Sequence, residues 1–440
     1  MKRELQHNIL VLAVAAFAFR LIFILIFPGP NYFDGISASY IEVAQNILQG
    51  KGIVTYVDIA PLSSPTSHWS YETFIDRPLG YLFLVLVPYA IVSSPFVIQL
   101  LHALLASLSA IALYRVGQLI VSEHAAWRAA LLYSVWPLSA RFEIAILPDA
   151  VMPFFLVLTL WLLIRGVKEP ERPKWYLLSG IACGIGMTMR PDVLLLPIFF
   201  VAALLALRVA QKPLRASFLL LLGAVVILGV HTIRNYSATD GRIVPLGLGN
   251  GISMWEGISQ FGDTLGTVYG DERTAALEGY RAWAYPDGIE RDRNRFSEAL
   301  GIIGQHPGWY AGVMAKRLPV LLTPDWIMTR KFTPSLKEFL DSSGEHSIAQ
   351  YAATYPLSFI IRLLLVLLQY GALVLAVVAV VKDPRNKLLW FPVLLIFYYI
   401  VMHIPTNTEA RYFYPAIPIL LLLASHGWEK LRARRTVVMD

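Results

Sequence analysis

The residues best suited to chemistry are charged side chains at the ends of apolar runs. Asp34 follows the first run, Asp149 precedes a later run, and Asp76 and Arg77 stand just before a shorter one. A charge in or beside a membrane span is costly, about 2.5 kcal/mol or more for Asp or Arg at a helix centre, so such residues are functional candidates. A carboxylate can serve as a general base, and Arg binds phosphate through paired hydrogen bonds.

Further charged and polar candidates stand at comparable run ends. They are Arg190, His231, Arg234, Arg411 and Tyr412. Arg77, Arg234 and Arg411 come from three separate run ends and lie near two or more carboxylates in the sequence. This pattern suggests an anion site that faces a base.

Each candidate also has a structural interpretation, which the sequence leaves open. Asp34 can cap the amphipathic helix expected after it, and Asp149 can be a favourable charge at a helix N-terminus. Arg77 can anchor to lipid headgroups. Arg190 can form a local ion pair in the turn Arg190-Pro191-Asp192.

Three other charges lie within or next to apolar runs. Arg20 is inside the first run and needs a partner or a water-filled cavity, so we expect it to orient Asp34 or to reach a lipid phosphate. Arg141 and Glu143 end a later run, where they pair with each other or the Arg meets lipid.

Composition places the chain in a membrane. Of its 440 residues, 56% are hydrophobic and 15% are charged, whereas a soluble domain carries about 25% charged residues. The net charge of +7 comes from Lys and Arg dispersed between apolar runs, so we expect no nucleic-acid partner. Cys183 is the single cysteine, which excludes a disulfide framework and a thiolate metal site. The first apolar run is expected to be a retained signal anchor.

The apolar runs predict an all-α polytopic membrane protein with about ten transmembrane helices, because a span needs roughly 20 apolar residues. The expected spans are residues 8–27, 97–120, 125–141, 150–166, 175–190, 193–209, 216–234, 357–381, 388–404 and 411–428. The shorter run 79–92 is either a further span or a helix that lies in the membrane interface.

The distribution of basic residues decides between these two possibilities. With the N-terminus inside and 79–92 in the interface, the inner loops contain Lys2, Arg3, Arg115, Arg128, Arg165, Lys168, Arg172, Lys174, Arg208, Lys212, Arg215, Lys382, Arg385, Lys387, Lys430, Arg432, Arg434 and Arg435. The positive-inside rule requires this arrangement. We therefore expect a multi-pass protein of the inner or plasma membrane, with both termini cytoplasmic and an extracytoplasmic active site.

The same topology divides the chain into three parts. Residues 1–234 form an N-terminal transmembrane catalytic module with an outer loop at 28–96. Residues 235–356 are the only long polar stretch and are expected to be a small extracytoplasmic domain, whose apolar piece 310–324 rests on the membrane. Residues 357–440 supply the C-terminal transmembrane helices.

These features, in this order, resemble the polyprenyl-phosphate-dependent glycosyltransferases of the membrane-embedded C superfamily. The likeness is greatest to the branch with protein O-mannosyltransferases and lipid A aminoarabinose transferases, and it covers most of the chain outside 240–350. It rests on the segments DGISASYIEVAQNILQGKG, DRPLGYLFLVLVP and IALYRVGQLIVSEHAAWRAALLYSVWP, on Pro-Asp-Ala at 148–150, and on Ala-Arg-Tyr-x-x-Pro-x-x-Pro at 410–418.

The resemblance implies a lipid-linked sugar donor outside the membrane and an inverting transfer. Asp34 matches the position of the catalytic base, and Arg77 that of the basic residue which contacts the donor phosphate. Asp76 matches the acidic residue before it, and Asp149 the second acidic site of the outer loops.

Arg234 and Arg411 correspond to further phosphate contacts. Beside them, we expect His231, Tyr412 and Arg190 to be supporting residues. Two departures leave the acceptor open as a lipid, a glycan or a protein. Gly35 stands where many members have a second acidic residue, and 235–356 lacks the repeats that protein mannosyltransferases carry there.

Three alternatives to this glycosyltransferase remain. One is a transporter or flippase for polyprenyl lipids, which predicts charges buried mid-membrane and broken helices in paired halves. The others are a polymerase or ligase of lipid-linked glycans and a non-catalytic relative that binds polyprenyl lipids.

The motifs of ATP-driven pumps, zinc proteases and serine hydrolases are absent from the sequence. We predict no metal site and no certain cofactor. A divalent metal shared by Asp34 and Asp149 is left open.

Overall fold

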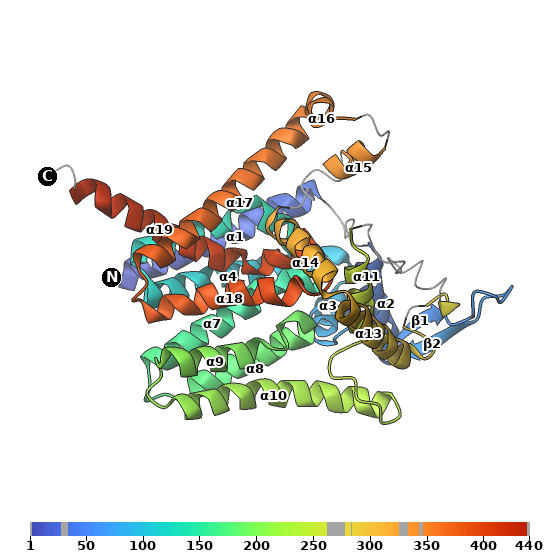
Figure 1. The fold of residues 1–440 in the computed structure, drawn as a ribbon. Coiled ribbons are helices and arrows are strands. Elements are labelled where there is room, and N and C mark those ends of the chain that lie inside the picture. The colour runs from blue at the N-terminus through green and yellow to red at the C-terminus, as the bar shows by residue number, and fades with distance from the viewer. Residues whose placement is uncertain are drawn as a thin grey trace.

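The computed structural model describes residues 2–27, 34–261, 278–282, 284–324, 333–342 and 346–437. These residues form a bundle of long helices, with shorter helices and one two-stranded sheet gathered at one end (Figure 1). The N-terminal and C-terminal ends lie together at the opposite end of the bundle. The prediction of an all-α polytopic membrane protein is confirmed, apart from this small sheet.

Among the described residues, five helices are long and apolar enough to cross a membrane: Leu5–Ile26, Pro95–Ile120, Pro148–Lys168, Pro213–Ala238 and Pro356–Lys382. Every expected span except 125–141 corresponds to one helix of varying length, in some cases preceded by a short 3-10 turn. These helices are α1 (Lys2–Ile26), α4 (Pro95–Ile120), α7 (Met152–Lys168), α8 (Lys174–Met189), α9 (Leu196–Leu207), α10 (Pro213–Ala238), α17 (Pro356–Lys382), α18 (Trp390–His403) and α19 (Ile417–Val437).

The expected span 125–141 is wrong as a single helix. The chain instead forms α5 (Glu123–Ser134) and α6 (Pro137–Glu143), separated by Val135 and Trp136. Proline has no N–H to continue a helical ladder, and its ring clashes with the preceding turn. Pro137 therefore ends α5 and begins a new helix.

Side-chain caps and prolines define where several helices begin. Ser94 accepts a hydrogen bond from the N–H of Phe96 at the start of α4, with Pro95 in the first turn. Ser122 caps α5 by accepting from Ala125. Such caps satisfy N–H groups that have no partner within the helix.

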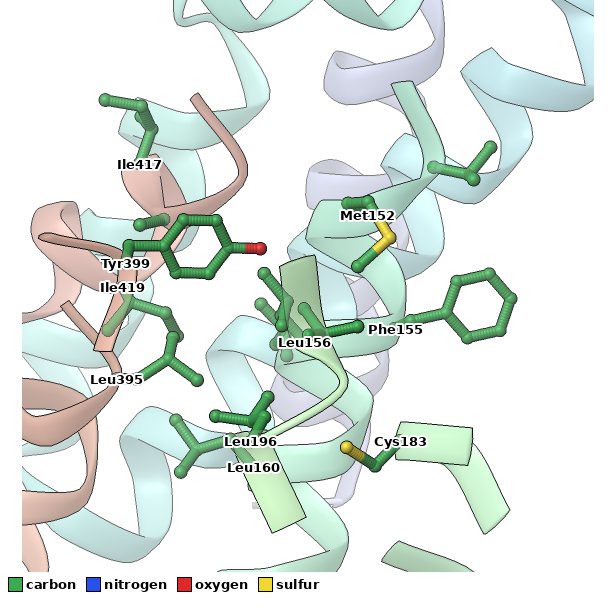
Figure 2. Packing of buried hydrophobic residues seen from close by; sticks show 14 of the residues in the cluster. Met152, Phe155, Leu156, Leu160, Cys183, Leu196, Leu395, Tyr399, Ile417 and Ile419 are labelled. Carbon is green, nitrogen blue, oxygen red and sulfur yellow. The ribbon is translucent and has the colours of Figure 1, made fainter. Parts of the chain in front are cut away.

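The bundle interior is apolar and closely packed (Figure 2). Met152, Leu156 and Leu160 of α7 lie in one cluster with side chains of α8, α9, α18 and α19. The helix pair α8 and α10 approaches very closely, since a Cβ atom on Gly180 would lie 2.0 Å from the carbonyl oxygen of Leu220. Small residues at such positions let membrane helices pack backbone against backbone.

The segment after α1 builds a cap on one end of the bundle. It contains α2 (Asp34–Leu48), strands β1 (Val54–Asp58) and β2 (Trp69–Thr73), and α3 (Gly80–Ile91). The strands are antiparallel, with Val54 opposite Thr73 and Asp58 opposite Trp69. The sequence analysis did not predict this hairpin.

Helix α3 corresponds to the run 79–92. It has 12 residues, about 18 Å of helix, against a hydrocarbon core of about 30 Å. Phe83, Val87 and Ile91 form an exposed apolar stripe at helical spacing, whereas Tyr81 and Val85 are buried. A short helix with an exposed apolar stripe agrees with a position in the interface.

The described parts of 235–356 also form helices near this end of the bundle (Figure 1). They are α11 (Asn250–Ile258), α13 (Gly288–Gln305), α14 (Pro307–Leu322), α15 (Leu336–Asp341) and α16 (Ile348–Thr354). Helix α14 contains most of the apolar piece expected at 310–324. Short 3-10 helices connect the spans: η1 (Pro148–Val151), η2 (Pro191–Val193), η3 (Lys387–Leu389) and η4 (Ala410–Ala416).

Candidate active site

A cavity of about 440 Å³ lies where α2, α11, η1, η2 and the loop before η4 meet. Residues predicted from the sequence make up much of its polar lining: Asp76, Arg77, Asp149, Arg190, Arg411 and Tyr412. The structure thus brings together charges that are more than 300 residues apart in the sequence.

One wall is a chain of alternating charges. Arg190 follows α8, and its Nη1 donates to Oδ1 of Asp149 in η1. The Nε of the same Arg190 lies 3.2 Å from Asp192 Oδ1, and Asp192 Oδ2 lies 3.3 Å from His403 Nε2. The local pair expected in the turn is therefore present, but Arg190 also binds Asp149. These side chains are each 11% exposed or less, so the charges are shielded from solvent and act strongly on a ligand.

Tyr412 organises the cations of this wall. Its ring stacks on the His403 ring at 4.9 Å, and the guanidinium carbons of Arg190 and Arg411 lie 5.2 Å and 5.3 Å from its centroid. Arg411 Nη2 also pairs with Glu409 at 2.9 Å. Contact between a guanidinium and an aromatic face is favourable, so the ring holds both Arg side chains at the cavity.

The Asp76–Arg77 segment forms another part of the lining. Arg77 Nε lies 3.8 Å from Asp76 Oδ2. Within the described part of the chain, Arg77 Nε and Asp76 Oδ1 are buried and have no hydrogen-bond partner. Burial raises the pKa of the Asp76 carboxyl, and the adjacent guanidinium opposes part of that rise. Buried polar atoms without partners are rare and call for a ligand or water.

His231 and Arg234 hold this segment and do not line the cavity. His231 Nε2 accepts from the N–H of Leu79 at 3.0 Å. Arg234 Nη1 donates to the carbonyl of Phe74 and to Asn235 Oδ1, both at 3.0 Å. Both residues come from the end of α10, so they attach the segment that carries Asp76 and Arg77 to a long helix.

Helix α2 begins at Asp34, whose side chain lies outside the described part of the structure. Ile36 and Tyr40, one helical turn apart on the same helix, both line the cavity. The start of α2 therefore borders the cavity, and the assignment of Asp34 as a base remains a prediction.

The expectation for Arg20 is wrong, because its guanidinium is occupied inside the bundle. Its Nε lies 2.6 Å from Glu143 Oε2, and its Nη1 and Nη2 donate to the carbonyls of Ser134 and Tyr133. Arg20 therefore does not extend to lipid. Arg141, which we expected beside Glu143 or lipid, has its guanidinium carbon 4.5 Å from the centre of the Phe27 ring.

The sequence analysis missed several residues of the site. Tyr40 and His403 were not among the candidates, although His403 lies at the end of the apolar run 388–404. Asn407 Nδ2 donates to Glu256 Oε2 at 2.8 Å, which joins the loop before η4 to α11. No local pattern marks such a pair, because its members are 151 residues apart.

Among the residues that the structure describes, no group of three His, Cys, Asp or Glu side chains is placed to hold a metal ion. The described lining contains carboxylates, guanidinium groups, aromatic rings, amides and the imidazole of His403.

Comparison with known proteins identifies part of the chain. Residues 76–233 match the sequence profile of the family described as dolichyl-phosphate-mannose-protein mannosyltransferase. They include Asp76, Arg77, Asp149 and Arg190. No curated protein matches the chain significantly.

Two solved structures of one enzyme share the fold at low sequence identity, and a third structure gives a weaker match. The apo oligosaccharyltransferase of Archaeoglobus fulgidus aligns with a TM-score of 0.51 and 12% identity, over 98% of this chain and 51% of that one. The same enzyme tethered to an acceptor peptide gives 0.50 and 12% identity, over 99% and 51%. ArnT from Cupriavidus metallidurans bound to undecaprenyl phosphate gives 0.33 and 12%, over 90% and 73%.

The chain therefore spans about half the length of the archaeal oligosaccharyltransferase that it matches. The profile match over residues 76–233 bears out the resemblance stated from the sequence, and the archaeal structure shares the fold of the chain.

Proposed function

We propose that the chain is an inverting glycosyltransferase that moves a sugar from a polyprenyl-phosphate donor to an extracytoplasmic acceptor. The observation that carries the proposal is the cavity in which Arg77, Arg190 and Arg411 meet buried carboxylates. Arg77 and Arg190 lie within residues 76–233, which match a family named for a dolichyl-phosphate sugar donor. Apart from the Arg20–Glu143 pair inside the bundle, the candidate charges collect around the cavity at one end of it, which is less consistent with a transporter.

The reaction is a single displacement at the anomeric carbon. The carboxylate of Asp34 takes the proton from the acceptor nucleophile, whose electron pair forms the new bond to the anomeric carbon. The bond from that carbon to the phosphate oxygen breaks, and its electron pair leaves on the phosphate. Arg77 and Arg411 stabilise the charge that develops there, and attack from the opposite face inverts the configuration.

The ion pairs around Arg190 support a positioning role for Asp149 besides its predicted catalytic one. Its bond to Arg190 keeps a carboxylate beside the cations. The guanidinium groups are thereby held in place before the donor binds, and little reorganisation is needed during transfer.

The membrane side of the proposal concerns the donor's tail. The exposed stripe of Phe83, Val87 and Ile91 on α3, with exposed fractions of 50%, 62% and 77%, offers apolar surface beside the segment that carries Arg77. A polyprenyl chain or lipid tails would cover it, which removes apolar area from water.

The proposed orientation puts both termini in the cytoplasm of a multi-pass protein of the inner or plasma membrane. In its support, the turns between α9 and α10 and between α17 and α18 lie with the chain ends at one end of the bundle, whereas α2, α11 and the hairpin lie at the other (Figure 1). These turns contain Arg208, Lys212, Arg385 and Lys387, as a cytoplasmic face requires.

The test is transfer from a panel of radiolabelled polyprenyl-phosphate sugars into membranes that contain the full chain. Asp34→Asn should abolish transfer while expression and membrane insertion stay intact. Glu42→Gln is the matched control, because Glu42 lies on the same helix but outside the cavity lining. The side-chain amide oxygen of the glutamine can still accept the hydrogen bond that Glu42 accepts from the N–H of Tyr56. Full activity in Asp34→Asn would refute the base assignment, and no transfer by the native chain from any donor would refute the function.

A further inference from the structure

Tyr40 lies in an unusual environment at the cavity. Its side chain is 0% exposed, and in the described structure its hydroxyl is buried without a hydrogen-bond partner. The residue nevertheless lines the cavity, one turn along α2 from Ile36. Buried Tyr hydroxyls usually find a partner, so this one has an unused donor at the edge of a polar cavity.

The ring of Tyr40 is held by two other buried aromatic rings. Tyr81 meets it edge-on at 4.9 Å, and Phe74 does so at 5.8 Å. Both neighbours are fully buried. Edge-to-face contacts of this kind are favourable and fix the ring plane, so the direction of the hydroxyl is fixed before any ligand binds.

The electrostatic surroundings suit an anion next to this hydroxyl. Burial raises the pKa of Tyr40, so its hydroxyl stays protonated and able to donate at neutral pH; charges on Arg77, Asp76, Asp149 and Arg190 also act on it. The buried Arg77 Nε, likewise without a partner in the described residues, is a second donor of this kind. A negatively charged phosphate oxygen accepts stronger hydrogen bonds from such donors than a neutral acceptor does.

We propose that Tyr40 is a donor-binding residue whose hydroxyl donates a hydrogen bond to the phosphate of the polyprenyl-phosphate donor, beside Arg77. This inference rests on the proposed function and assigns a contact that charge patterns in the sequence do not reveal. The residue contributes a neutral, fixed hydrogen bond where the neighbouring groups contribute charge.

Tyr399 provides a matched control within the same chain. It is 1% exposed, and its hydroxyl is also buried without a partner among the described residues. However, Tyr399 does not line the cavity. Its hydroxyl points toward the apolar side chains around Leu156 and Met152 (Figure 2). The charges of Asp192 and Arg190 act on this hydroxyl, so its loss changes the buried polar surroundings of the site but removes no group from the cavity lining.

The experiment compares Tyr40→Phe and Tyr399→Phe in the purified full-length protein with undecaprenyl phosphate as the probe. Tyr40→Phe should weaken binding by about 10-fold or more, as expected for a hydrogen bond to a charged group. Tyr399→Phe should leave the affinity within about 2-fold, since its hydroxyl does not line the cavity. Both variants keep the aromatic ring, and thermal unfolding checks that each is folded.

Wild-type affinity for undecaprenyl phosphate in Tyr40→Phe would overturn the proposal. An effect limited to the sugar-bearing donor, with binding of undecaprenyl phosphate unchanged, would also overturn it by assigning Tyr40 to the sugar. Equal weakening in both variants would overturn it as a general effect of buried hydroxyls. Failure of the native chain to bind the probe or transfer a sugar would instead refute the proposed function.

Discussion

Arg20 of α1 and Glu143 at the end of α6 form an ion pair of 2.6 Å inside the bundle, and both side chains are completely buried. The carboxylate also accepts from the hydroxyl of Tyr133, while the guanidinium meets the last carbonyls of α5. A charged donor near a helix C-terminus compensates carbonyls that have no helical partner. The ion pair therefore fixes the end of α5 against α6 at the break between these two helices.

Glu143→Gln should destabilise the protein by about 3–5 kcal/mol, because it leaves Arg20 as an uncompensated buried charge. The measurement is the free energy of unfolding or the melting temperature in detergent. The double variant Arg20→Leu/Glu143→Leu should lose less stability than the sum of the losses in Arg20→Leu alone and Glu143→Leu alone. Additive losses would mean that the two residues act independently.

Arg190→Gln should lower kcat for sugar transfer by about 100-fold or more, a loss typical of removing a preorganised electrostatic group. The change removes the cation that joins Asp149 to Asp192. Steady-state kinetics and a melting curve separate this effect from unfolding. A folded variant with unchanged kcat would exclude the charge chain from the reaction.

Arg77→Ala should mainly change donor binding, whereas Arg234→Ala should mainly change stability. Arg77 lines the cavity, so its loss should raise the KM for the donor by about 10-fold or more. Arg234 binds the carbonyl of Phe74 outside the lining, so its loss should mainly lower the melting temperature. A larger effect of Arg234→Ala on donor affinity would support direct phosphate contact by Arg234, as the sequence analysis proposed.

The hairpin should depend on pH through Asp58. Burial alone raises the pKa of this carboxyl, but N–H groups of His68 and Ala60, with Ser67 and Arg281, lower it to about 2. Because this folded value lies below an unfolded value of about 3.9, the stabilisation is complete above that pH and is lost as the pH falls toward 2.

Hydrogen exchange of residues 54–73, corrected for the intrinsic rate, should therefore be slow at pH 5 and faster near pH 2. Asp58→Asn should remove this difference and weaken the link to Arg281, whose Nη1 lies 2.8 Å from Asp58 Oδ2. A hairpin whose protection stays constant over this range would contradict the assignment.

Reporter fusions test the orientation. A reporter fused after residue 122 should be cytoplasmic, because the basic turns are expected on the cytoplasmic side. A reporter fused near residue 290 should be extracytoplasmic. The reverse result would show that residues 79–92 cross the membrane.

The long helices were predictable because hydropathy over about 20 residues is a local property. The break at Val135 and Trp136 also had a local signal, since Pro137 cannot continue a helix. The sequence of the hairpin carries a weaker local signal, because its strands are only 5 residues each.

Long-range pairing in the site could not be derived from the sequence. The sequence indicates that Arg20 needs a partner, but not that this partner is Glu143, 123 residues away. Asp149 has no basic residue next to it in the sequence, and Arg190, in the turn between two later spans, supplies its partner. The position of the candidates at one end of the spans was predictable, and their exact partners were set by helix packing.

The close contact of α8 and α10 has a mechanical consequence for the cavity. Each helix supports a different wall, since Arg190 follows α8 and the end of α10 holds the segment with Asp76 and Arg77. Gly180 leaves no side chain between the two backbones that could reorient to let them slide. We therefore expect the two walls to move as one unit, so that any widening that admits a substrate comes from α2 and α11, which also line the cavity.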